Sequence, residues 1–503
     1  MQPILVASTY YLELDPKQVR KMRPFPPLAT LYVAAGLRAA GHPVVFFDAM
    51  LARAEGGFEA ALERWQPRVV VLYDDNFNFL SKMCLTRMRD AALRMCRSAR
   101  AAGAWVVVSG PDMTDHPQQY LAAGAHAVAV GEGDHTVLEL VEWRQSGGTG
   151  DIPGRIPGVV GGPTGTITGA RRNERHPDVF PHPARDLVDM DAYRQLWRDH
   201  HGRFTLNIVS TRGCPFHCNW CAKPIWGQRY AMRSAADVAA EVADLKSRFQ
   251  PDELWFADDI FGLREAWLEE FAAEIQRQDA VIPFSMQSRC DLMSAGAVAA
   301  LHRAGCAEVW LGAESGSQRV LDAMDKGITV QDIRTARRRL GEAGIRASFF
   351  VQFGYPGEDL VDIRATIELL RETLPDNIGV SVSYPLPGTR FHTMVADQLA
   401  DKVNWEDSAD LDMMFRGTFS SAFYRHLHTV LHDDLHLHRR LAGLPGVPAV
   451  ALEEVPVAAQ QDRVDAGWAR LEELALTERL RRPTLLVRSE PVPVAPDLSQ
   501  THG

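Results

Sequence analysis

The stretch TRGCPFHCNWCAKPIWGQRY, residues 211–230, gathers Cys214, Cys218 and Cys221, three of only seven cysteines in the chain. Their Cys-x3-Cys-x2-Cys spacing supplies three soft ligands from one loop, which suits zinc or an iron–sulfur cluster. A closed structural zinc site needs a fourth ligand, and no second Cys or His pair lies near His217. A four-iron cluster held by three cysteines leaves one iron open to bind a small molecule. The loop therefore favours such a cluster, with structural zinc as the alternative.

The cysteine stretch follows the first of six strand-like runs that alternate with amphipathic helical runs. The apolar runs lie at 204–211, 253–258, 284–290, 308–315, 346–354 and 378–386. Short apolar runs separated by helices predict parallel strands. Six repeats predict a partial (β/α)6 barrel over 204–395, with its active site at the carboxyl ends of the strands. The cysteine loop therefore lies at the end of a barrel strand where active sites are found.

A separate strand–helix series fills the N-terminal third of the chain. Its Val-rich runs lie at 3–8, 43–49, 69–74, 105–110 and 127–133. They predict a doubly wound, Rossmann-like parallel sheet over 1–145, with its ligand beyond the carboxyl ends of the strands. No Gly-x-Gly-x-x-Gly loop follows the first run, so the pattern alone does not name that ligand. The fold class is therefore α/β, with two successive parallel sheets.

The remaining segments differ in composition from both series. We expect a Gly/Pro/Thr-rich linker with one small hairpin over 146–203, a helical C-terminal domain over 396–484 and a Pro/Ser-rich disordered tail over 485–503. The C-terminal domain carries five clustered histidines, His426, His428, His432, His436 and His438. Their helical spacing permits a metal site, but we expect a solvated polar face. The cysteines outside the loop are expected to be small buried hydrophobes: Cys84, Cys96, Cys290 and Cys306.

With Trp220 before the last cysteine, the loop resembles the Cys-x3-Cys-x-aromatic-Cys signature of the radical S-adenosylmethionine (SAM) family. The resemblance extends over residues 204–395 and implies that the three cysteines hold a 4Fe-4S cluster whose open iron binds SAM. The cluster and SAM then generate a 5′-deoxyadenosyl radical, while the protein positions and shields it. The resemblance also implies an external flavodoxin- or ferredoxin-like electron donor. The implied SAM-binding residues are Trp220, Asp258, Asp259, Gly312, Glu314 and Ser315.

Two of these residues are adjacent acids at a strand end. Asp258 and Asp259 point to opposite faces of a strand, so only one of them is expected to face the site. Acids at strand ends can also simply cap helices, which is the alternative for Asp259.

The front sheet resembles the cobalamin-binding domain of cobalamin-dependent radical SAM proteins. The matching stretches are PPLATLYVAAGLRAAGHPVVFFDA (26–49) and VVVSGPDMTDHPQQYLAAGAHAVAVGEGDHTVLELV (106–141). The Asp-x-His-x-x-Gly pattern that supplies histidine to cobalt elsewhere is absent, and the first histidine is His42, so we expect no protein histidine on cobalt. A vestigial sheet without corrinoid is the alternative. The implied cobalamin-binding residues are Ser109, Gly110, Gly131, Glu132 and Gly133.

Composition bounds the partners and the location. The 503 residues carry a net charge of -10 without long charge runs, which argues against nucleic acid as a partner. The N-terminus does not read as a signal peptide, and no run of about 18 apolar residues predicts a membrane span. We expect a cytoplasmic protein that acts on a small molecule.

Together the two resemblances imply a cobalamin-dependent radical SAM enzyme similar to the class B methyltransferases. Such an enzyme methylates an unactivated carbon, or a phosphinate phosphorus, through the 5′-deoxyadenosyl radical and methylcobalamin. One alternative keeps both cofactors but performs oxidative cyclisation or ring rearrangement without methyl transfer. A lesser alternative is a non-catalytic corrinoid- or metal-binding module. The C-terminal third is expected to select the substrate, which the sequence does not identify.

Overall fold

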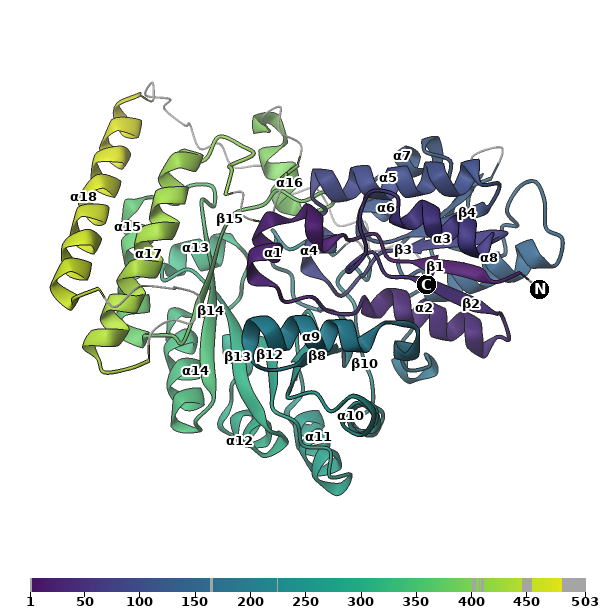
Figure 1. Ribbon diagram of the computed structural model, residues 1–503. Coiled ribbons are helices and arrows are strands. Elements are labelled where there is room, and N and C mark those ends of the chain that lie inside the picture. Colours follow the sequence, from purple (N-terminus) through teal and green to yellow (C-terminus); the bar gives the residue numbers. More distant parts are fainter. Residues whose placement is uncertain are drawn as a thin grey trace, which may run out of the picture.

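The structure is a computed structural model that describes residues 2–162, 166–223, 225–399, 404–406, 408, 411–445 and 455–481. Two separate β-sheets lie side by side, each with helices packed against it, and two long C-terminal helices lie beside the second sheet (Figure 1). This arrangement confirms the expected α/β fold. The tail expected over 485–503 lies outside the described residues.

The front sheet has the strand order β2-β1-β3-β4-β5-β6-β7. Its first five strands run parallel and are almost wholly apolar, because helices cover both faces. The order β2-β1-β3-β4-β5 is that of a doubly wound sheet, as predicted. These strands are β1 Ile4–Ala7, β2 Val44–Phe47, β3 Val69–Tyr73, β4 Trp105–Ser109 and β5 Ala127–Ala129. Its helices include α1 Pro16–Lys21, α2 Leu28–Ala39, α3 Gly57–Trp65, α4 Phe79–Met83, α5 Thr86–Ala101, α6 Pro111–Asp115, α7 Pro117–Ala122 and α8 Asp134–Gln145.

The described residues of the segment 146–203, which was expected to be a linker, are folded against the front sheet. Strands β6 Val159–Gly161 and β7 Thr166–Ile167 extend that sheet as an antiparallel hairpin. Helix α9 Met190–His201 is held by the Tyr193 hydroxyl, which donates to Asp48 at 2.8 Å. The Trp197 indole N–H donates to the Pro24 carbonyl at 2.7 Å. This segment therefore completes the front domain.

The second sheet contains six parallel strands in the order β8-β11-β12-β13-β14-β15. It is an open half-barrel, which confirms the predicted partial (β/α)6 fold. The strands are β8 Thr205–Ile208, β11 Glu253–Phe256, β12 Phe284–Ser288, β13 Cys306–Glu314, β14 Arg346–Phe353 and β15 Ile378–Val382. The helices are α10 Ala235–Phe249, α11 Glu265–Arg277, α12 Ala295–Ala304, α13 Gln318–Ala323, α14 Val330–Glu342, α15 Leu360–Thr373 and α16 Arg390–Val395.

The C-terminal region packs helix α17 Ser421–Leu441 against α15 and against α18 Val457–Arg481. Asp434 of α17 accepts hydrogen bonds from Arg371 of α15 and from Trp468 of α18. The rings of His428 and His432 lie 4.5 Å apart, half-buried rather than on the solvated face that we expected. Within the described ranges, no group of three or more His, Cys, Asp or Glu side chains is arranged to hold a metal ion.

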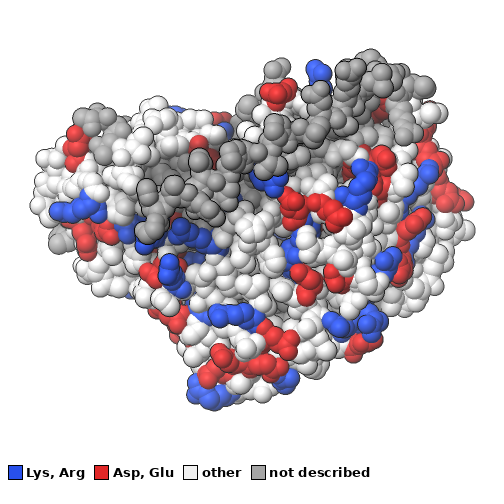
Figure 2. Space-filling view, turned by 180° about the vertical axis from the view of Figure 1, so that it is seen from behind, with Lys and Arg blue, Asp and Glu red and all other residues white. Residues whose placement is uncertain are grey.

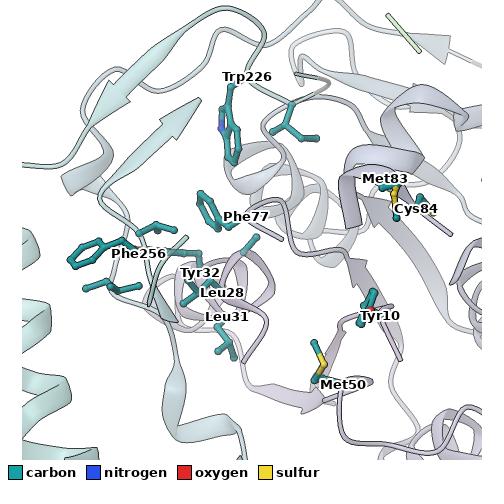
Figure 3. Close-up of a cluster of buried hydrophobic side chains, with 14 of the residues drawn as sticks. Tyr10, Leu28, Leu31, Tyr32, Met50, Phe77, Met83, Cys84, Trp226 and Phe256 are labelled. Carbon is teal, nitrogen blue, oxygen red and sulfur yellow. The ribbon is translucent and has the colours of Figure 1, made fainter. Parts of the chain in front are cut away.

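One buried apolar cluster joins the two sheets. Tyr32 and Phe77 of the front domain lie near Trp226, which follows the cysteine loop (Figure 3). The Phe77 and Trp226 rings stack with centroids 5.2 Å apart. Phe77 follows β3 and Trp226 follows β8, so the cluster places the carboxyl ends of both sheets against each other. Among the described helices, none is long and apolar enough to span a bilayer.

Candidate active site

Two ion pairs connect the carboxyl-end edges of the two sheets. Arg212, just after β8, binds Glu132, which follows β5, with 2.7 Å between Nη1 and Oε1. Lys82 of α4, after β3, pairs with Asp259, which follows β11. Arg212 lies two residues before Cys214, and Asp259 lies within electrostatic range of Cys214 and Cys221. The site expected in the barrel therefore lies directly against the expected site of the front sheet.

The cysteine loop is closed at its base by a short antiparallel ribbon. Strand β9 Thr211–Gly213 pairs with β10 Tyr230–Met232. Gly213 has a φ of +81°, and a Cβ there would lie 2.3 Å from the Arg229 carbonyl oxygen, so a side chain is excluded. The Lys223 ammonium donates to the carbonyl oxygens of Cys214 and Phe216 inside the loop. These contacts fix the turn that carries the three thiols.

Asn219 fastens the middle of the loop to segments that follow β13 and β15. Its backbone N–H donates to the Met324 carbonyl at 3.0 Å, and its side-chain amide donates to the Ala323 carbonyl at 2.8 Å. Its own carbonyl accepts from the Phe391 N–H at 3.0 Å. The loop is therefore held on the barrel side by residues more than a hundred positions away.

The three thiols lie within electrostatic range of one another. Burial raises the pKa of the Cys214 thiol and raises that of Cys221 to about 12, and the neighbouring thiols and Asp259 act in the same direction. Each cysteine of a cubane site binds a different iron, so its thiols stand farther apart than the ligands of a single ion. The absence of a single-ion site among the described residues is therefore compatible with a cluster.

Cationic side chains surround this donor set. Arg289 Nη1 lies 4.0 Å from the Cys218 sulfur. Lys326 is buried and lies within electrostatic range of the same thiol. Lys223 lies within electrostatic range of Cys214 and Cys221. Positive charge of this kind stabilises thiolates and an anionic cluster. Three soft donors ringed by cations fit a 4Fe-4S cluster.

The adjacent acids after β11 take different roles. Asp258 is fully buried and accepts from the Ser210 N–H at 2.8 Å, the Ser210 hydroxyl at 2.7 Å and the Thr211 N–H at 2.7 Å. It therefore braces the start of the cysteine ribbon, and burial raises its pKa to about 6. Asp259 is instead paired with Lys82 and lies within electrostatic range of Cys214 and Cys221. Of the two, Asp259 is the carboxylate beside the cluster loop.

The end of β13 carries a second carboxylate of the site, that of Glu314. Glu314 binds Lys326 at 2.7 Å, and both side chains are buried. Its φ of +58° and a register shift against β14 mark a local irregularity, which is common at functional sites. A Cβ on Gly312 would lie 2.6 Å from Lys326 Nζ, so a side chain there would displace the Lys326 ammonium. Ser315 is turned toward Thr366, 3.1 Å away.

Trp220, the aromatic residue of the signature, packs against a small buried cluster that includes Met324, Tyr355 and Phe391. Its indole N–H is buried without a hydrogen-bond partner in the part of the chain that the structure describes. An unsatisfied buried donor of this kind costs free energy unless a ligand binds it. The donor lies in the cysteine loop, where SAM is expected.

The residues expected to bind cobalamin form a tightly packed turn. A Cβ on Gly110 would lie 2.6 Å from the Asp74 Cβ. A Cβ on Gly133 would lie 2.3 Å from the Ser109 hydroxyl, which donates to Ala129. Gly131 donates its N–H to the Thr114 hydroxyl. These residues shape the edge of the sheet, whereas Glu132 is directed into the contact with Arg212.

Asn76 supplies an acceptor at the same edge. Its side chain is 2% exposed, and its Oδ1 has no hydrogen-bond partner among the described residues. The amide side chains of a corrin ring carry N–H groups, which can donate a hydrogen bond to such an acceptor. The front edge therefore fits a cobalamin.

Several residues of the site were not predicted from the sequence: Lys82, Arg212, Trp226, Arg289 and Lys326. Lys82, Arg212, Trp226 and Arg289 make their key contacts with a residue distant in sequence or in the other sheet. Lys326 lies within electrostatic range of Cys218, which is distant in sequence. The one local signal is the position of Arg212, two residues before the first cysteine of the loop.

Comparison with known proteins identifies both domains. Residues 208–370 match the model of the Radical SAM superfamily, and residues 23–141 match that of the B12 binding domain. An uncharacterized methyltransferase of Pyrococcus horikoshii is 28% identical over 322 residues, which are 62% of this chain and 68% of that protein. An anaerobic magnesium-protoporphyrin IX monomethyl ester cyclase of Rubrivivax gelatinosus is 26% identical over 196 residues, 38% of this chain but only 34% of the cyclase.

Solved structures extend the likeness of fold to both domains together. The radical SAM methyltransferase TsrM from Kitasatospora setae, with cobalamin and a 4Fe-4S cluster bound, aligns with a TM-score of 0.67 at 17% identity. The alignment covers 95% of this chain and 99% of that chain. The chain therefore combines a radical SAM domain with a B12 binding domain. It is a cobalamin-dependent radical SAM enzyme, with SAM, a 4Fe-4S cluster and cobalamin as its cofactors.

Proposed function

We propose that this enzyme methylates an unactivated carbon, or a phosphinate phosphorus, of a small molecule held between the two sheets. The observation that carries the proposal is the direct contact between the two carboxyl-end edges, through Arg212 with Glu132 and Lys82 with Asp259. When bound, SAM and the cluster supply radical chemistry, and cobalamin supplies a methyl carrier. A reaction that uses both must hold its substrate within reach of both.

The residues of the barrel edge have distinct tasks in this scheme. Cys214, Cys218 and Cys221 bind the cluster, and the cations around them balance its negative charge. Asp259 offers a carboxylate to the ammonium group of SAM, and the Trp220 N–H offers a donor. Gly312 keeps the end of β13 free of a side chain beside Lys326.

The apolar cluster between the sheets excludes water from the same edge. Trp226 and Phe77 are 5% and 8% exposed, and Tyr32 beneath them is 5% exposed. A dry site strengthens electrostatic contacts and protects reactive species from solvent. Figure 3 shows Trp226, Phe77 and Tyr32 following one another in the buried cluster.

We place substrate selection on the segment that follows the barrel. The Trp405 carbonyl accepts from the Thr86 N–H at 2.8 Å, and the Ser408 hydroxyl donates to Asp15 at 2.8 Å, so the segment reaches the front domain. The Trp405 ring also lies 4.6 Å from that of Tyr384, after β15. The buried Trp405 indole N–H has no partner within the described ranges and is available to a substrate acceptor.

The proposal includes a reductant and a location. A flavodoxin- or ferredoxin-like protein outside the chain would supply the electron that the cluster needs. All seven cysteines are free thiols, which suits a reducing compartment, and we assign the enzyme to the cytoplasm. On the face shown in Figure 2, basic side chains lie next to acidic ones, which favours a small-molecule substrate over nucleic acid.

Anaerobic reactions with a small-molecule extract test the function while the substrate is still unidentified. One reaction receives SAM with an ordinary methyl group, and the other receives SAM with a trideuterated methyl group. We expect the product of the labelled reaction to be heavier than that of the unlabelled reaction by the difference between three deuterium and three hydrogen atoms. The Cys218→Ala variant should give neither product. A new product that forms without the label, together with 5′-deoxyadenosine, would assign the enzyme to cyclisation or rearrangement instead.

A further inference from the structure

Arg212 is a buried cation at the entrance of the cysteine loop, and its partners belong to the other domain. Its Nη1 donates to Glu132 Oε1 at 2.7 Å and to Asp134 Oδ2 at 3.0 Å, and its Nη2 donates to Asp134 Oδ1 at 3.2 Å. The three side chains are 5%, 2% and 8% exposed. Only Gly213 separates Arg212 from the first cluster cysteine.

Aromatic rings enclose the guanidinium on its remaining sides. Its central carbon lies 3.9 Å from the centroid of Phe180, 5.4 Å from that of Tyr32 and 5.8 Å from that of Phe77. All three rings come from the front domain or from the segment that completes it. The rings add cation–π attraction and keep water away from the ion pairs.

Both carboxylate oxygens of Glu132 accept hydrogen bonds from protein groups. Oε1 accepts from Arg212 and from the Trp226 indole N–H at 3.3 Å, and Oε2 accepts from the Glu174 backbone N–H at 2.6 Å. In the sequence, Arg212 precedes the first cysteine of the loop and Trp226 follows the last one. Glu132 therefore holds both ends of the segment that contains the three cysteines.

We propose that Arg212 is a positioning residue that locks the cluster loop to the front sheet, and that Glu132 acts as its anchor and not as a cobalamin ligand. A planar guanidinium donates to two carboxylates through a rigid fork of N–H groups, whereas the three donors of an ammonium radiate from a single nitrogen. Because these ion pairs are buried, loss of the guanidinium would leave two carboxylates without a countercharge, whereas loss of Glu132 leaves Arg212 paired with Asp134. The proposal rests on the cofactors assigned above but does not depend on methyl transfer.

Hydrogen exchange and metal analysis of the holoprotein test the proposal. The variants are Arg212→Lys, which keeps the charge but loses the fork, and Glu132→Gln, which leaves Arg212 paired with Asp134. The matched control is Arg439→Lys, because Arg439 is 3% exposed and binds Asp376 and the Leu374 and Pro375 carbonyls, away from the loop. The readouts are amide exchange over residues 211–232, bound iron and cobalt, and the electron paramagnetic resonance spectrum of the reduced cluster.

We expect both test variants to exchange roughly tenfold faster or more over 211–232, because a buried charged hydrogen bond contributes about that factor to local opening. We expect cobalt and iron to stay at wild-type stoichiometry and the cluster spectrum to broaden. The control should leave the loop exchange and the spectrum unchanged. Loss of cobalamin from Glu132→Gln, with or without faster exchange, would overturn the proposal. So would loop exchange in both test variants equal to that of the control.

Discussion

The ammonium of Lys82, on α4 of the front domain, pairs with the carboxylate of Asp259, which follows β11 of the barrel. Lys82 also lies 5.6 Å from the centroid of the Trp226 ring, whose N–H binds Glu132. The Lys82–Asp259 pair and the Arg212–Glu132 pair thus meet at one indole beside the cysteine loop. We expect a change in the charge of either pair to alter the electrostatic potential at the cluster.

The Lys82 pair predicts a competition at Asp259. If this carboxylate receives the ammonium group of SAM, Lys82→Met removes a competing cation. We expect tighter SAM binding by up to about fivefold, since partly exposed ion pairs contribute up to about 1 kcal/mol. Equilibrium binding of SAM to the cluster-loaded protein measures this. Lys246→Met, which removes a surface lysine 3.5 Å from Asp279, is the control and should not change SAM affinity. Weaker SAM binding by Lys82→Met would show that the two cations do not compete.

The cluster assignment predicts different outcomes for two cysteine substitutions. Cys218→Ala removes one of the three thiolates, so we expect loss of the 4Fe-4S absorption and of 5′-deoxyadenosine formation. Cys96→Ala changes a fully buried thiol in α5 of the front domain and should keep both. Iron analysis and product chromatography under anaerobic conditions measure the effects. Four bound irons and continued SAM cleavage in Cys218→Ala would remove this residue from the ligand set.

Local sequence patterns predicted the two sheets because each strand is a short apolar run between helices. They also predicted the three thiols, since cluster ligands from one loop have a fixed spacing. The contacts between the sheets were not accessible in this way. Arg212 and Glu132 lie 80 positions apart, and nothing in either stretch indicates that one neutralises the other. Likewise, only the fold shows that Asp258 binds the backbone of Ser210 and Thr211 while Asp259 faces the loop.

Glu358, at the turn after β14, predicts a pH dependence of stability. It is 1% exposed, accepts from the Gly354 N–H at 2.5 Å, and burial raises its pKa from 4.5 to about 8. The folded state then binds more protons than the unfolded state between these values. Stability from this group is therefore present below about pH 4.5 and lost as the pH rises toward 8, with a slope of at most about 1.4 kcal/mol per pH unit.

Denaturant unfolding at pH 6 and at pH 8.5 compares the wild type with Glu358→Gln. Because the amide does not titrate, we expect the variant to lose less stability than the wild type over this interval. An equal loss in both proteins would show that Glu358 is ionised throughout.

The front sheet predicts a cobalt without protein histidine. His42 precedes β2 and lies at the amino end of the sheet, opposite the contact edge. At the carboxyl side, His116 lies 3.8 Å from Asp112 and His135 lies 3.7 Å from Glu174. We expect the spectrum of the cob(II)alamin form to show no splitting from nitrogen-15-labelled protein histidine. His116→Ala and His135→Ala should leave that spectrum unchanged, and a labelled splitting lost in either variant would identify a ligand.

The central claim is that the cluster and cobalamin meet at one edge between the two sheets. Pulsed electron paramagnetic resonance of the holoprotein, with the cluster reduced and cobalt in the cob(II)alamin form, measures the dipolar coupling between the two centres. We predict a clear coupling in the wild type and none in Cys218→Ala, which keeps only the cobalt. Full occupancy of both centres in the wild type without measurable coupling would contradict a shared site.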